Sequence, residues 1–97
     1  MSETRAVSVR VLDREYTVGV PGGEVDGLMA AARLLDTRMR EVRGANRMAA
    51  IDRVAVLAAL NLAHELEQLK AAGEQRDREL SRALASLQAR VDALLDA

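Results

Sequence analysis

Residues 51–95 read IDRVAVLAALNLAHELEQLKAAGEQRDRELSRALASLQARVDALL and predict one uninterrupted helix. At a rise of about 1.5 Å per residue it would run on the order of 65 Å, whereas an ordinary globular helix has roughly 11 to 12 residues. The remaining residues 1–50 are too few to cover its apolar side chains, and a domain of that size is marginal by itself. We therefore expect further copies of the chain to bury this helix in an oligomer.

The proximal part of this helix, residues 51–66, is apolar around most of its circumference. A helix of this kind is covered on several sides. We therefore expect it to pack against the N-terminal half of its own chain and against the helix of a partner. The residues predicted at this dimer interface are Val54, Leu57, Leu60, Leu62 and Leu66.

Beyond Leu66 the apolar pattern narrows to a seam with coiled-coil spacing. Two registers of alternating four- and three-residue steps meet at Leu80 in a stutter, which locally unwinds a supercoil, and Gly73 and Arg76 interrupt the proximal register. A solvated single helix is the alternative, but the distal spacing favours pairing as a parallel dimer, an antiparallel dimer or a four-helix bundle. The residues predicted at a tetramer interface are Leu80, Leu84, Leu87, Val91 and Leu94.

Residues 1–50 predict a small N-terminal head. Apolar residues alternate with polar ones on both sides of a polar turn at residues 13–15, which predicts a β-hairpin at about residues 6–20. A repeat of three and four residues then predicts a helix at about residues 23–43, ended by Gly44, with a loop at residues 44–49. The expected fold class is α+β, with this hairpin and helix followed by one long coiled-coil helix at residues 51–97.

Composition excludes several classes of protein. There is no cysteine and one histidine, so neither disulfides nor a thiolate metal site is expected. The 14 basic and 15 acidic side chains nearly balance, and Tyr16 is the single aromatic residue, so nucleic-acid binding is not expected. The N-terminus lacks a secretory signal pattern, and the most apolar run, Val54 to Ala63, is half the length of a bilayer span of about 20 residues. We expect a soluble cytoplasmic protein that does not bind membranes.

No catalytic constellation emerges from the residues. His64 and Glu65 lack the second histidine of a zinc motif, and Gly22 and Gly23 lack the spacing and lysine of a phosphate loop. We therefore expect no enzyme activity, metal or cofactor. The clearest charge bias lies within residues 38–47, where a solvated helix end is favoured over a surface for an acidic partner; its basic side chains are Arg38, Arg40, Arg43 and Arg47.

Three stretches together resemble the ZapA family of bacterial division-ring proteins: VSVRVLDREYTVGVP at residues 7–21, LMAAARLLDTRMREVR at residues 28–43 and DRVAVLAALNLAHEL at residues 52–66. The resemblance implies a non-enzymatic adaptor that binds the tubulin-like GTPase FtsZ at mid-cell and cross-links its filaments. It also implies head-to-head dimers that join through their tails into tetramers. One departure is Gly19 and Val20 before Pro21, where the family often has a cysteine before the proline.

The same resemblance implies where FtsZ would bind. Carried over by position, the contacts are Arg14 near the hairpin turn, Asp52 at the start of the long helix, and Leu57 one turn later. We add Arg53 to these contacts because of its expected exposure and its charge. Leu57 fits a place in the protein core as well as it fits an FtsZ contact. The alternative function is a coiled-coil oligomerisation module whose basic face at residues 38–47 docks on nucleic acid or an anionic membrane.

Overall fold

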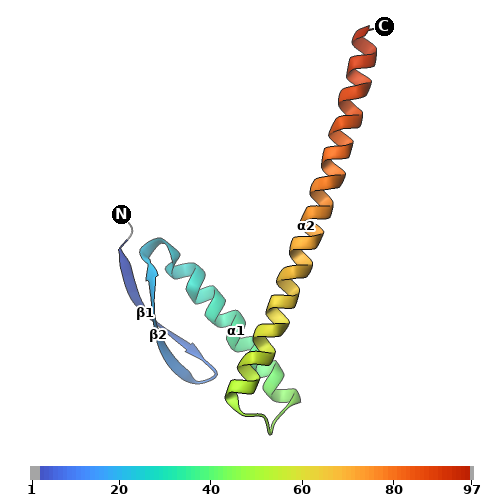
Figure 1. Ribbon diagram of the computed structural model, residues 1–97. Helices are drawn as coiled ribbons and strands as arrows, with labels where there is room; N and C mark the ends of the chain where they lie inside the picture. The colour runs from blue at the N-terminus through green and yellow to red at the C-terminus, as the bar shows by residue number, and fades with distance from the viewer. Residues whose placement is uncertain (1–2, 97) are drawn as a thin grey trace. The chain divides into compact units, whose positions relative to one another are not determined.

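A computed structural model describes residues 3–96, so Ala97, the last residue of the predicted long helix, lies outside the described residues. Figure 1 shows an antiparallel strand pair, β1 (Thr4–Val11) and β2 (Arg14–Pro21), followed by a 3-10 turn at Gly22–Glu24. Two helices complete the chain, α1 (Val25–Ala45) and α2 (Ile51–Asp96). The predicted α+β class, with a hairpin, a helix and one long C-terminal helix, is confirmed.

The described chain forms two compact units, and the division between them falls inside α2. The first, which we call the head unit, extends to Asn61, and the second begins at Leu62. The head unit thus includes the first turns of α2 as well as the hairpin and α1.

The hairpin places one row of side chains against α1. Val7 lies opposite Val18 and Val9 lies opposite Tyr16 in the strand register. Because side chains alternate between the two faces of a strand, these residues share one face. Val9 and Val11 on that face are buried, and α1 packs mainly on β1.

The hairpin turn lies one residue earlier than the polar residues indicated. Its two residues are Leu12 and Asp13, with φ of 51° and 64°, whereas Arg14 and Glu15 already belong to β2. Two-residue hairpin turns with positive φ at both positions match the right-handed twist of the flanking strands. The predicted turn at residues 13–15 was wrong. Leu12 is apolar, and its type indicates a strand residue and not a turn residue.

The C-terminus of α1 also differs from the prediction. The helix continues through Gly44 to Ala45, so Gly44 does not terminate it. Instead, Asn46 caps the helix: its backbone N–H donates to the carbonyl oxygens of Val42 and Arg43, and its side-chain amide donates to Val42 at 3.2 Å. These bonds satisfy the last carbonyl groups without a left-handed glycine.

The core of the head unit combines residues from the hairpin, α1 and the first turns of α2. Val54 and Ala58 of α2 are almost completely inaccessible to solvent, at 1% and 0% exposed. The buried core residues are Val9, Val11, Leu12, Ala32, Met39, Val54 and Ala58. The base of the long helix is therefore an integral part of the head fold.

The second unit is the distal part of α2, where the large aliphatic side chains from Leu66 onward are exposed in the single chain. Glu67 and Lys70 pair at 3.5 Å, and Gln75 and Gln88 each donate to an acid four residues later, at 2.9 Å. Exposed pairs at this spacing each stabilise a helix by only about 0.2–0.5 kcal/mol. These polar pairs do not bury the exposed aliphatic side chains of the same helix. Burial of those side chains requires a partner.

Candidate functional site

Arg14, the predicted contact near the hairpin turn, is the first residue of β2. It lies opposite Val11 in the strand register, and its side chain is exposed. Its position along the chain is directly after the turn residues Leu12 and Asp13. Arg14 is therefore paired with β1 across the hairpin and joined directly to the turn.

A polar network on α1 holds the turn. Leu12 N–H donates to Asp36 Oδ1 at 2.7 Å, and Arg40 Nε donates to Asp36 Oδ2 at 3.0 Å. Arg40 Nη2 also donates to Asp13 Oδ1 at 3.0 Å. Asp36 of α1 thus binds the backbone of Leu12, and Arg40 of α1 binds the side chain of Asp13.

The charges in this network stabilise one another. The hydrogen bond from Arg40, followed by that from the Leu12 backbone, lowers the pKa of the Asp36 carboxyl below its ordinary value of 3.8. Hydrogen bonds to Asp36 and Asp13 in turn raise the pKa of Arg40 above its ordinary value. At neutral pH Asp36 is therefore ionised and Arg40 protonated, so the hydrogen bond between them joins opposite charges.

Asp52 and Arg53 lie in the first turn of α2, and both are exposed. Asp52 Oδ1 accepts a hydrogen bond from the backbone N–H of Arg53 at 2.9 Å. A carboxylate at this position also interacts favourably with the positive end of the helix dipole. Arg53 lines a shallow hollow together with Ala45, the last residue of α1, and residues 46–49 of the loop between the helices.

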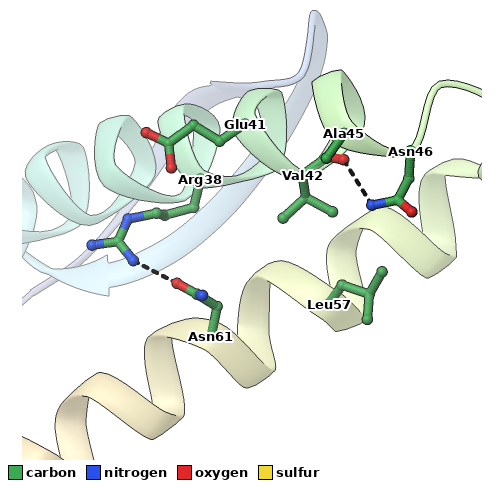
Figure 2. A pocket seen from close by; sticks show the side chains of 7 residues that line it. All are labelled: Arg38, Glu41, Val42, Ala45, Asn46, Leu57 and Asn61. Atoms are coloured by element: carbon green, nitrogen blue, oxygen red, sulfur yellow. Dashed lines mark hydrogen bonds between the residues drawn. The ribbon is translucent and has the colours of Figure 1, made fainter.

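Leu57 lies one turn later and lines a second hollow, of about 390 Å³, between α1 and α2. Figure 2 shows Leu57 below Val42 and the end of α1, with Arg38 and Asn61 joined across the two helices. Arg38 Nη1 donates to Asn61 Oδ1 at 2.6 Å. Leu57 itself is half-buried, so its side chain contributes to packing and also faces the hollow.

The structure brings some of the predicted contacts together. The hollows lined by Arg53 and by Leu57 share Ala45 and Asn46, so both residues neighbour the C-terminal end of α1. Arg14 lines neither of these two hollows. It belongs instead to the hairpin end that the α1 network binds.

The basic side chains at residues 38–47 do not form a uniform solvated face. Arg38 bonds to Asn61, and Arg40 binds two carboxylates. The sequence analysis missed the second arrangement because it depends on the contact between Leu12 and Asp36, which lie 24 residues apart. The spacing of Asp36 and Arg40 indicates only an ordinary pair on one helix.

The residues predicted at the dimer interface have different environments. Val54 is part of the core of its own chain, whereas Leu57 and Leu62 are half-buried. Leu60 and Leu66 are 62% and 56% exposed, so they are the members of this group that a partner could cover most fully. The predicted tetramer-interface residues are all exposed: Leu80, Leu84, Leu87, Val91 and Leu94.

The head unit also has an apolar groove that the sequence analysis did not single out. Its volume is about 450 Å³, and its lining comes from both strands, α1 and Ala55 of α2. The residues that line it are Val9, Val11, Tyr16, Val18, Leu28, Ala31, Ala32, Leu35, Met39 and Ala55. Their periodicity predicted a buried face on each element, but not that the faces leave an open groove.

Metal-binding clusters and membrane-spanning helices are both absent from residues 3–96. In this part of the chain, no group of three or more His, Cys, Asp or Glu side chains is placed to hold a metal ion. Within the same residues, no helix is both long enough and apolar enough to cross a membrane.

Comparisons with known proteins agree on one family. The family model described as "Cell division protein ZapA" matches residues 7–91. A curated protein named cell division protein ZapA, from Pseudomonas aeruginosa PAO1, is 43% identical over 96 residues, which is 99% of this chain and 86% of the relative.

Two solved structures have the same fold. One, titled as an unknown conserved bacterial protein from Pseudomonas aeruginosa PAO1, matches with a TM-score of 0.70 and 39% identity, covering 90% of this chain and 96% of that one. The other is a ZapA mutant dimer from Geobacillus stearothermophilus, with a TM-score of 0.66 and 25% identity, covering 84% of this chain and 93% of that one.

Proposed function

Because this chain belongs to the ZapA family of cell division proteins, we propose that it is a non-enzymatic adaptor that binds FtsZ and cross-links its filaments. The observation that carries the proposal is the family match over residues 7–91, which covers most of the head unit and most of α2. In this role the protein would act at mid-cell, where it would promote assembly and stability of the division ring.

Cross-linking requires at least two FtsZ-binding heads in one assembly. We propose that the head units pair first, since the similar Geobacillus stearothermophilus ZapA structure is a dimer and Leu60 and Leu66 are exposed in the single chain. The distal seam would then join two dimers into a tetramer, since its aliphatic residues repeat at coiled-coil spacing and are exposed. Several weak contacts in one assembly hold filaments by avidity.

The proposed division of labour follows the sequence regions. Residues 1–50 form the head, the proximal part of residues 51–97 packs in the head dimer and completes the FtsZ-binding surface, and the distal part forms the bundle. The proposed FtsZ contacts are Arg14, Asp52, Arg53 and Leu57, all of which are exposed or half-buried in the head unit.

The alternative, a module that docks on nucleic acid or anionic membrane through residues 38–47, is not favoured. Arg38 and Arg40 already bond to groups of the head unit, and two carboxylates bind Arg40. The two carboxylates beside Arg40 weaken the positive field that such a surface would need.

The proposal is tested by sedimentation of FtsZ filaments assembled with GTP. The wild-type protein should pellet with the filaments and form bundles visible by electron microscopy. Arg14→Glu and Asp52→Lys should abolish co-sedimentation because each reverses the charge of a proposed contact, while the oligomeric mass stays unchanged.

Matched control variants lie on the same head unit. Arg33→Glu reverses an exposed charge on α1, and Asp26→Lys removes an acid from the first turn of α1 as Asp52→Lys does from α2. Both controls should pellet as the wild type does. If Arg14→Glu and Asp52→Lys pellet equally well, the proposed contacts are wrong, and if the wild-type protein does not pellet with FtsZ at any salt concentration, the proposed function is wrong.

A further inference from the structure

The hairpin turn has a backbone conformation that Leu12 does not adopt by preference. Its φ of 51° is in the left-handed region, which is uncommon for bulky apolar residues. Such a conformation persists only where the surrounding structure holds it. Contacts outside the hairpin therefore add to the strand pairing that holds the turn.

Those contacts come from α1 and from the core. The Leu12 side chain is buried, and its N–H donates to Asp36 Oδ1. Arg40 then bridges Asp36 and Asp13, with both N···O distances at 3.0 Å. We call these four residues, Leu12, Asp13, Asp36 and Arg40, the tip clamp.

The tip clamp binds the part of the hairpin that carries Arg14. Helix α1 packs mainly on β1, and β2 has few contacts with it. Arg14 begins β2 and directly follows Asp13. The clamp therefore connects α1 to the hairpin turn, which leads directly into β2.

We propose that Asp36 and Arg40 are positioning residues for FtsZ binding, which act by holding the hairpin turn so that Arg14 is oriented before the filament arrives. This inference rests on the proposed function, in which Arg14 contacts FtsZ. A contact residue on a fixed turn loses less conformational freedom on binding than one on a mobile turn, and so binds more tightly.

The clamp is not suited to a purely structural role. The side chains of Asp36, Arg40 and Asp13 are 26%, 42% and 67% exposed, and exposed ion pairs contribute little to global stability. None of these three side chains is among the buried core residues of the head unit, although Asp36 bonds to the backbone of Leu12, which is. Their removal should therefore change the order of the turn and the affinity for FtsZ much more than the folding of the protein.

The experiment compares Asp36→Ala, Asp36→Asn and the wild-type full chain by two measurements. Hydrogen exchange of the Leu12 amide reports the turn, and co-sedimentation across FtsZ concentrations reports the affinity. Asp36→Ala should lose protection of the Leu12 amide and bind FtsZ about 3- to 10-fold more weakly, the cost of ordering one long side chain. Asp36→Asn retains an acceptor oxygen and should lie between the two.

A double variant separates positioning from other effects. Asp36→Ala combined with Arg14→Ala should bind FtsZ no more weakly than Arg14→Ala alone, because the clamp would act through Arg14. Asp26→Ala removes an exposed acid from the same helix and is the matched control, with no expected change in either measurement.

The outcomes distinguish this inference from the function on which it rests. Equal binding by the wild type and Asp36→Ala, or additive losses in the double variant, overturns the positioning role while the FtsZ adaptor function stands. An unchanged exchange rate of the Leu12 amide in Asp36→Ala overturns the clamp itself. Failure of the wild-type protein to bind FtsZ overturns the proposed function and the positioning role with it.

Discussion

At the residue scale, the apolar first turns of α2 contain side chains in opposite environments. Val54 is 1% exposed in the core of the head unit, whereas Val56, two residues later, is 58% exposed. The sequence could not separate them because a helix that is apolar on most sides has no single buried stripe. The burial of each residue is determined by where the hairpin and α1 pack on α2.

This difference predicts unequal effects of identical substitutions. Val54→Ala removes two buried carbon atoms and leaves a cavity, so it should lower the free energy of unfolding by about 2 kcal/mol. Urea unfolding followed by circular dichroism measures the change. Val56→Ala is the matched control, with an expected change within about 0.5 kcal/mol; equal losses for the two variants would contradict the described core.

At the element scale, periodicity predicted the hairpin and both helices, and local chemistry determined where they end. The turn at Leu12 and Asp13 and the cap at Asn46 depend on bonds to Asp36, Val42 and Arg43 that composition does not reveal. The proposed FtsZ contacts were indicated by family resemblance and not by any local motif. The tip clamp could not be predicted because its key bond joins residues distant in sequence.

Within α2, Gly73 is an avoidable weakness. A Cβ atom built there would meet only the Arg76 side chain, at 3.9 Å, and the glycine does not have a positive φ. Gly73→Ala should therefore stabilise the helix by about 1 kcal/mol, the difference in helix propensity between the two residues. Thermal unfolding followed at 222 nm checks this.

The control for this substitution is Gln68→Ala, at another exposed position of the same helix. Glutamine and alanine both favour helices, so the thermal midpoint of Gln68→Ala should differ little from that of the wild type. A lower midpoint for Gly73→Ala than for the wild type would mean that the helical assembly requires a residue without a side chain at this position.

At the scale of the whole molecule, the proposed assembly with several heads would depend on two apolar regions of one helix. The proximal region contributes to the head unit and to its proposed pairing surface, and the distal seam exposes five aliphatic side chains at residues 80–94. Gly73 and Arg76 lie between these regions. The helix would thus set the spacing between the filament-binding heads of the assembly.

The two regions should be separable by substitution. Replacing Leu84, Leu87 and Val91 together by Ala should convert tetramers to dimers, because the distal seam loses most of its apolar contact area while the head surface is intact. Light scattering across protein concentrations measures the mass. Arg78 and Arg82 replaced together by Ala, away from the seam, should leave the tetramer unchanged, and a seam variant that remains tetrameric would contradict the tail-to-tail arrangement.

The most direct test of the cross-linking function compares the wild type and this seam variant on FtsZ filaments assembled with GTP. High-speed sedimentation detects binding, and low-speed sedimentation detects bundles. We predict that the wild-type protein pellets at both speeds and that the seam variant pellets with filaments only at high speed, because its heads still bind but no longer join distant filaments. The account is contradicted if the wild-type protein leaves FtsZ filaments unbound and unbundled under conditions in which it is tetrameric.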